Sequence, residues 1–184
     1  YFGQDLRPSS AEIAAQCMAA AEDEKLEPVD CGALPTPALA AWAIARGAAS
    51  IMVTGSHIPA DRNGVKFYRP DGEIDKGDEA AISARVGDID RAAMRWTPHH
   101  RPADASAAAL SAFVARYEGF LAEGCLAGKR IGVYEHSTVI RDLLAGILAP
   151  SGAEIVPVGR SDVFVPVDTE AVSDQARARI RAWT

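Results

Sequence analysis

Apolar and polar positions follow two different periods along the chain, and the two periods alternate. Apolar residues spaced three and four apart predict helices, whereas short continuous apolar runs predict buried strands. The predicted helices cover residues 10–21, 38–46, 75–86, 107–122, 138–148 and 173–183. The predicted strands cover residues 1–4, 26–30, 50–54, 66–68, 130–134 and 154–158. This alternation predicts an α/β fold with a mixed, largely parallel sheet sandwiched by helices.

Local signals indicate where two of the helices begin. Ser9 and Glu12 have the spacing of a capping box in front of the first helix. Thr36 followed by Pro37 predicts a second helix in which Thr36 is the N-cap.

A break near residues 124–128, with glycine at both ends, separates the last long helix of the first part from a new strand. We therefore expect a first domain over residues 1–125 and a second, incomplete domain over residues 126–184. The chain opens inside a predicted strand and ends inside a predicted helix, so we expect it to be a fragment of a longer protein.

Composition narrows the classes of function. The 184 residues carry a formal net charge of −6 and no basic stripe interleaved with aromatic residues, so we expect no nucleic-acid partner. Three cysteines without a Cys-x-x-Cys pair disfavour a zinc site or a disulfide framework. They favour a reducing, cytoplasmic compartment. No apolar run approaches the length of a membrane span, so we expect no membrane partner.

The loop at residues 55–65 follows a continuously apolar strand and carries the candidate chemistry. Open α/β sheets bind their ligands just past the carboxyl ends of such strands. Gly55 allows the backbone to approach a phosphate closely, and successive N–H groups in such a loop can bind an anion. Ser56 offers a hydroxyl that can hold a phosphoryl group. His57 and Lys66 add a proton donor or acceptor and a positive charge.

A serine next to a histidine is by itself weak support for catalysis, because adjacent side chains usually point in different directions. Ser56 is not in a G-x-S-x-G motif, which argues against an esterase nucleophile. The chain also lacks the G-x-x-x-x-G-K-[ST] motif of a nucleotide-binding P-loop. The other histidines, His99, His100 and His136, are expected to be polar residues that face solvent.

The longer string from Thr54 to Lys66 resembles the phosphoserine loop of the α-D-phosphohexomutases. That loop reads Thr-(Ala/Gly)-Ser-His-Asn-Pro and, a few residues later, Asn-Gly-x-Lys. The matching residues are Thr54, Gly55, Ser56, His57, Pro59, Asn63, Gly64 and Lys66. Ile58 stands where the family usually has Asn, which removes a side-chain amide from the loop. Residues 3–10 and 30–37 resemble two further segments of the family's first domain, Gly-x-Asp-x-Arg-x-Ser and Gly-x-x-x-Thr-Pro.

The resemblance implies domain I of a phosphohexomutase followed by the start of domain II. It implies an enzyme that interconverts hexose 6-phosphate and hexose 1-phosphate through a phosphoserine and a bisphosphorylated sugar. Ser56 would carry the phosphoryl group, Lys66 and Arg7 would steady its charge, and His57 would shape the loop and assist proton transfer. Arg7 could instead simply pair with Asp5 at the surface. The expected substrates are phosphates of mannose or glucose, with glucosamine phosphate as the alternative.

The resemblance also implies a Mg²⁺ cofactor. The metal would be bound through the phosphate on Ser56 and by aspartates of an Asp-Gly-Asp-x-Asp-Arg loop, but this sequence contains no Asp-Gly-Asp. We therefore expect the 184-residue chain by itself to be inactive. A function of another class stays open, in which the chain is a non-catalytic module that binds a phosphosugar or a partner chain.

Overall fold

The computed structural model describes residues 1–89, 92, 97–168 and 171–183. The helices of these residues are α1 (Ser10–Asp23), α2 (Thr36–Ile44), α3 (Lys76–Arg85), α4 (Ser106–Glu118), α5 (Arg141–Leu148) and α6 (Asp174–Trp183), with short 3₁₀ turns at Val86–Asp88 and Ala149–Ser151. The strands are β1 (Phe2–Gln4), β2 (Val29–Ala33), β3 (Ser50–Val53), β4 (Val65–Arg69), β5 (Gly72–Glu73), β6 (Ala103–Asp104), β7 (Arg130–Tyr134) and β8 (Glu154–Val158). None of the described helices has the length and apolar character needed to cross a membrane.

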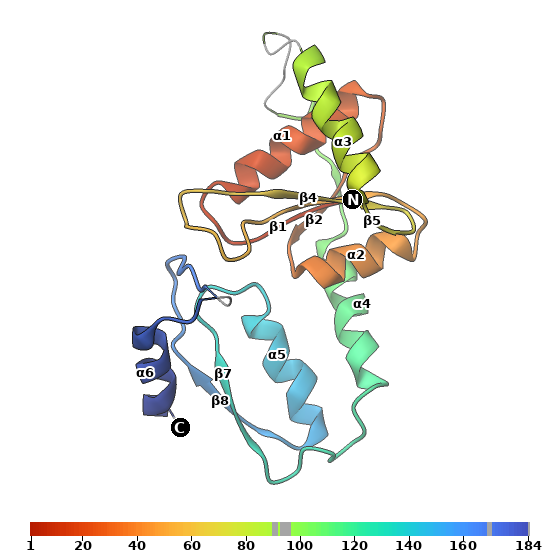
Figure 1. The fold of residues 1–184 in the computed structure, drawn as a ribbon. Coiled ribbons are helices and arrows are strands. Elements are labelled where there is room, and N and C mark those ends of the chain that lie inside the picture. The colour runs from red at the N-terminus through yellow and green to blue at the C-terminus, as the bar shows by residue number, and fades with distance from the viewer. Residues whose placement is uncertain (90–91, 93–96, 169–170, 184) are drawn as a thin grey trace.

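The first sheet has six strands in the order β5-β4-β3-β1-β2-β6. Strand β1 lies between β2 and β3 and is parallel to both, and β6 is parallel to β2. Strands β4 and β5 complete the sheet as antiparallel neighbours of β3 and of each other. Helices α1 and α3 cover one face of this sheet and α2 and α4 cover the other (Figure 1). The predicted fold class is therefore confirmed.

The main apolar core lies between this sheet and helices α2 and α4. Leu34, Leu39 and Met52 are almost completely buried there, and Phe113 of α4 packs with them. Burying each such side chain contributes about 1.5–3 kcal/mol of hydrophobic free energy. Small residues on both helices, such as Ala38, permit close packing between them. This packing of the sheet against α2 and α4 fixes the positions of the carboxyl ends of β1, β2 and β3.

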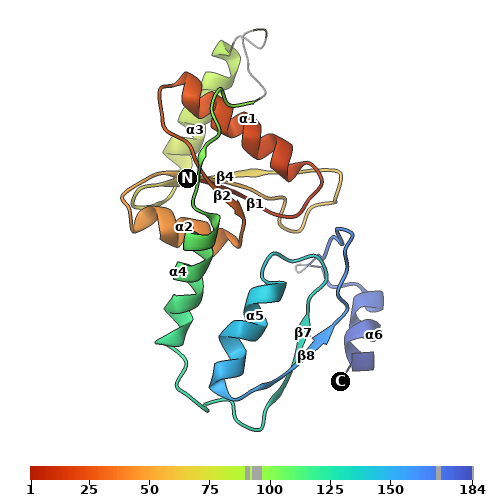
Figure 2. The same ribbon diagram turned by 180° about the vertical axis from the view of Figure 1, so that it is seen from behind.

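The second sheet consists of β7 and β8, which are parallel and in register from Arg130 opposite Glu154 to Tyr134 opposite Val158. Helix α5 connects the two strands, and its residues Leu143 and Ile147 pack against the core that contains Phe113 of α4. Figure 2 shows α4 running from the first sheet toward α5 and the second sheet. The division of the chain at residues 125 and 126 stays a prediction.

The predicted strand over residues 26–30 was displaced by three residues. Residues up to Leu26 complete the end of α1, since the Leu26 N–H donates to the Ala21 carbonyl at 2.9 Å and the side chain is exposed. The strand then continues to Ala33, past the predicted end at Gly32. Gly32 adopts a positive φ of 63°, and the pairing register with β1 shifts at this point. A glycine bulge therefore replaces the expected strand end.

Ser9 occupies the N-cap position of α1, as predicted, but its side chain makes no capping hydrogen bond. Its hydroxyl instead accepts a hydrogen bond from Asn63 Nδ2 at 3.1 Å. The second predicted cap was wrong. Thr36 lies inside α2, and the N-cap position belongs to Pro35, whose extended backbone precedes the helix. The hydroxyl of Ser9 is used to connect α1 with a distant loop, which the local sequence pattern does not indicate.

Candidate active site

Ser56 lies in the loop that joins β3 to β4, beyond the carboxyl ends of the parallel strands. The Thr54 N–H donates to the Gly64 carbonyl at 3.0 Å, so the two ends of the loop are held together. Ser56 is exposed and has a φ of +50°. A left-handed backbone is uncommon for a serine and costs free energy, so neighbouring groups must hold the loop in place.

The guanidinium of Arg7 is the main support of this loop. Its Nη2 donates to the carbonyls of Ser56 at 3.0 Å and Ile58 at 2.8 Å, and its Nη1 donates to those of Pro59 at 2.7 Å and Arg62 at 3.1 Å. The side chain has no solvent exposure. Charged donors form strong hydrogen bonds, and these four act on carbonyls between residues 56 and 62. Arg7 therefore supports the loop from beneath Ser56.

The carboxylate of Asp5 links Arg7 to the backbone of Ser56. Its Oδ2 lies 3.3 Å from Arg7 Nε and accepts a hydrogen bond from Thr54 Oγ1 at 2.8 Å. Thr54 Oγ1 in turn accepts from the Ser56 N–H at 3.3 Å. The other oxygen, Oδ1, accepts from the Arg7 N–H at 2.9 Å and from the Ser10 hydroxyl. The alternative pairing of Arg7 with Asp5 is thus present, but it is buried below the loop.

Asn63 attaches the other end of the loop to the start of α1. Its Nδ2 donates to the hydroxyls of Ser9 at 3.1 Å and Ser10 at 2.8 Å, while its Oδ1 accepts from the Gly64 N–H at 2.9 Å. In the sequence, Asn63 was recognised only as part of the motif, and Asp5 was given no role in the loop. Their positions in the segments that resemble the family were the only indication that these two residues support the loop.

Gly55 is required by the closeness of Arg7. A Cβ atom at this position would lie 2.5 Å from both Cζ and Nε of the Arg7 guanidinium. The guanidinium cannot move aside without losing its hydrogen bonds to the loop carbonyls. Gly55 therefore allows the backbone that precedes Ser56 to lie directly on a buried charge.

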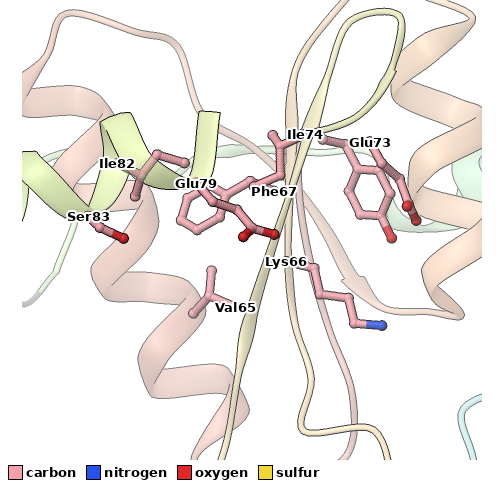
Figure 3. Close-up of a pocket in the computed structure, with 9 residues that line it drawn as sticks. Val65, Lys66, Phe67, Glu73, Ile74, Glu79, Ile82 and Ser83 are labelled. Carbon is pink, nitrogen blue, oxygen red and sulfur yellow. The ribbon is translucent and has the colours of Figure 1, made fainter. Parts of the chain in front are cut away.

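His57 and Lys66 are both exposed, His57 in the same turn as Ser56 and Lys66 on β4. Lys66 pairs across the sheet with Met52, which lines the cavity beside Ser56. Cross-strand partners share a face of the sheet, so Lys66 is on the same face as Met52, but it is not among the residues that line this cavity. Figure 3 shows Lys66 leaving β4 on the side opposite Val65 and Phe67. It borders a separate groove of about 520 Å³ between β4 and α3.

Ser56 opens into a cavity of about 220 Å³ whose walls come from both sheets. Thr54 and Ser56 belong to one wall, while His136 and Phe164 belong to the other. The ring of Phe164 lies 4.9 Å from Arg7 Cζ, which is a cation–π contact between the two parts of the chain. Both walls combine apolar side chains with a few polar ones, as is usual for sites that bind small molecules.

The expectation that His136 faces solvent was wrong. His136 is half-buried and lines the cavity that contains Ser56, because β7 ends there and directs its following loop toward the first sheet. Burial lowers the pKa of His136, and the positive charge of Arg141 lowers it further. His99 and His100 are exposed, as predicted.

The described residues do not form a complete Mg²⁺ site. Among them, no group of three or more His, Cys, Asp and Glu side chains is placed to hold a metal ion. The carboxylate that lines the cavity, Asp5, already accepts hydrogen bonds from Thr54, Ser10 and the Arg7 N–H. Mg²⁺ requires near-octahedral oxygen ligation, of which a phosphate on Ser56 would supply one ligand.

Comparison with known proteins agrees with this architecture. Residues 1–93 match the family model described as phosphoglucomutase/phosphomannomutase, alpha/beta/alpha domain I. The chain is 54% identical over 183 residues to a phosphomannomutase of Sinorhizobium fredii and 45% identical over 179 residues to a phosphomannomutase of Salmonella muenchen. These alignments cover 98% and 97% of the chain, which spans only 38% and 36% of the two relatives.

The fold is also similar to that of a solved structure. A phosphoglucomutase/phosphomannomutase family protein of Burkholderia thailandensis superposes with a TM-score of 0.65 at 22% sequence identity. The superposition covers 86% of this chain and 35% of the Burkholderia chain. At this level of identity the similarity concerns the fold.

Proposed function

This chain belongs to the phosphoglucomutase/phosphomannomutase family, and from that premise we propose that its Ser56 carries the phosphoryl group of a phosphohexomutase. The observation that supports this proposal is the placement of Ser56. Ser56 is exposed and lines a cavity. Its backbone is held in a left-handed conformation by Arg7, whose side chain is fully buried. A loop whose strain is offset by so many internal hydrogen bonds is typical of a functional site.

In the proposed reaction, phospho-Ser56 transfers its phosphoryl group to the free hydroxyl of a hexose phosphate. The bond between phosphorus and Ser56 Oγ breaks while a bond to the sugar oxygen forms. The proton lost by the sugar hydroxyl balances the proton gained by Ser56 Oγ. The bisphosphorylated hexose then reorients and returns its other phosphoryl group to Ser56. Interconversion of hexose 6-phosphate and hexose 1-phosphate follows.

The residues around Ser56 receive distinct roles in this proposal. Lys66, on the same face of the sheet as Met52, neutralises phosphoryl oxygens, and His57 shapes the turn and assists proton transfer. Arg7 is a positioning residue, because its donors are directed at loop carbonyls. Its positive charge beneath the turn still favours an anion on Ser56. Mg²⁺, when bound with ligands beyond those described, supplies further neutralisation of the transferred group.

Mannose phosphates are the proposed preferred substrates, with glucose phosphates as the second choice. The support is that both relatives matching almost the whole chain bear the name phosphomannomutase. Glucosamine phosphate stays the alternative within the family. Assay of the full-length protein with the three sugar 1-phosphates in parallel ranks them by kcat/KM, and a highest value for glucosamine 1-phosphate would contradict the proposal.

Turnover by the full-length protein tests the role of Ser56. With mannose 1-phosphate and Mg²⁺, the Ser56→Ala variant is expected to lose about 10³-fold or more in kcat, as for removal of a catalytic nucleophile. Ser83→Ala is a matched control, since Ser83 is an exposed serine on α3. Unchanged turnover in Ser56→Ala would rule out the mechanism.

A non-catalytic phosphosugar-binding module is the second candidate function. It is favoured by the absence of a metal-binding cluster among the residues that the structure describes. The 184-residue chain alone is expected to show no turnover of glucose 1-phosphate with Mg²⁺. Clear turnover by this chain would exclude the non-catalytic function and would show that it needs no further domains.

A further inference from the structure

The wall opposite Ser56 is built by the loop between β7 and α5. Residues His136 to Val139 follow the carboxyl end of β7 and line the same cavity of about 220 Å³ as Ser56. Loops at this end of a parallel strand are where open α/β sheets contact their ligands. Side chains from this loop therefore face any ligand that is bound next to Ser56.

The loop is held in one conformation by contacts with the segment after β8. Arg141 Nη1 donates to the carbonyls of His136 at 3.0 Å and Ser161 at 2.6 Å, and the Ser161 N–H donates to the His136 carbonyl at 3.0 Å. Ser137 Oγ accepts from the Val165 N–H at 2.8 Å. His136 itself has a positive φ of 21°, which is strained for a residue with a side chain. The backbone of His136 is thus held by contacts within the chain.

The imidazole of His136 has unused hydrogen-bonding capacity. Nδ1 is buried without a hydrogen-bond partner, and the ring packs against Tyr134 with 5.0 Å between centroids. His136 lines the cavity and its Nδ1 is enclosed by protein, so we infer that Nε2 is the ring nitrogen through which it would meet a ligand there. The lowered pKa of His136 keeps the ring neutral near pH 7, so Nε2 can hydrogen-bond an uncharged hydroxyl.

We propose that His136 is a substrate-contacting residue whose Nε2 hydrogen-bonds a hydroxyl of the hexose held between Ser56 and the β7–α5 loop. This inference rests on the proposed mutase function. It assigns to the second sheet a direct part in orienting the sugar relative to Ser56. The competing possibility is that His136 only packs against Tyr134 inside the second sheet.

Steady-state kinetics of the full-length protein with mannose 1-phosphate separate these possibilities. Gln places an amide near the position of Nε2, whereas Asn places one near Nδ1. We expect KM to rise about tenfold in His136→Asn and His136→Ala, the effect of losing about one uncharged hydrogen bond. His136→Gln is expected to stay within about threefold of wild type. His100→Ala, at an exposed histidine, serves as the control.

Thermal unfolding of each variant is measured alongside. Asn tolerates a positive φ, so KM of His136→Asn can be measured even if His136→Ala does not fold. Equal KM for wild type, Asn and Gln would overturn the inference while leaving the role of Ser56 intact. Rescue by Asn but not Gln would also overturn it, because the contact would then belong to Nδ1. Absence of turnover in the wild type would overturn the proposed function itself and this inference with it.

Discussion

Ser56 occupies a backbone conformation that serine rarely adopts, and the neighbouring residue types explain how it is maintained. Gly55 brings the chain within contact of the Arg7 guanidinium, and Arg7 then holds the Ser56 carbonyl at 3.0 Å. Neither Gly55 nor Arg7 is among the residues that line the cavity, so both act through the backbone of Ser56. At the scale of single residues, the site depends on close packing of backbone on a buried charge.

Replacing Gly55 by Ala tests this close packing. The new Cβ would lie 2.5 Å from Arg7 Cζ, so either the loop or the guanidinium must shift. We expect the free energy of unfolding to fall by about 1–3 kcal/mol, the usual cost of overpacking, measured by urea denaturation. Gly87→Ala is the control, because nothing lies within 4 Å of a Cβ there. Equal stability of the two variants would contradict the prediction.

The pKa of His136 predicts a pH-dependent component of stability. Its pKa is lowered in the folded protein by burial and by Arg141, so the folded state binds fewer protons than the unfolded state. The contribution of neutral His136 to the free energy of unfolding is therefore fully present above the unfolded pKa near 6.5. This contribution is lost as the pH falls below that value toward the folded pKa. Tyr134, whose hydroxyl accepts a hydrogen bond from Arg179 Nη1 at 3.2 Å, is the other polar ring beside His136.

Urea denaturation at about pH 7.5 and about pH 5.5 measures this component, since the two values lie on either side of the ordinary histidine pKa. Wild type should lose more stability between them than His136→Asn, which has no imidazole to protonate. The same loss in both proteins would show that His136 does not contribute.

The loop between β3 and β4 is supported by side chains from distant parts of the chain. Arg7 and Asp5 follow β1, and Asn63 reaches back to the hydroxyls of Ser9 and Ser10 at the start of α1. The loop joins β3 to β4, so the sheet positions its ends while these side chains position its middle.

Arg7→Lys tests the support of the loop as a whole. Lysine keeps the positive charge beside Asp5 but cannot reach the carbonyls of residues 56, 58, 59 and 62 with one ammonium group. We expect hydrogen exchange to accelerate over residues 56–62 and the free energy of unfolding to fall by about 1–3 kcal/mol, the cost of unpaired buried acceptors. Wild-type exchange rates in this loop would show that other contacts suffice.

Sequence periodicity predicted the position of Ser56 after β3 and the order of the helices and of six strands, but not the two-residue strands β5 and β6. It was insufficient where a side chain acts over a long distance in sequence. The hydroxyl of Ser9 appeared to be a local cap, yet it accepts a hydrogen bond from Asn63, 54 positions away. Likewise, nothing near His136 in sequence indicates that the β7–α5 loop faces Ser56, because that placement depends on packing of α5 against α4.

At the scale of the whole molecule, the two sheets meet at a cavity that neither forms alone. Helix α4 packs on the first sheet and contacts α5, which fixes the carboxyl end of β7 opposite the loop that contains Ser56. Phe164 stacking on Arg7 adds a direct contact at the same place. The loop that contains Ser56 and the β7–α5 loop that faces it are thus held by one connected core.

The most direct test of the account is intact-mass measurement of the full-length protein after incubation with mannose 1,6-bisphosphate. Wild type is predicted to gain the mass of one phosphoryl group, located on Ser56 by peptide mapping, while Ser56→Ala gains none. A phosphoryl group of equal occupancy on Ser56→Ala, or none on wild-type protein, would contradict the claim that Ser56 carries the transferred group.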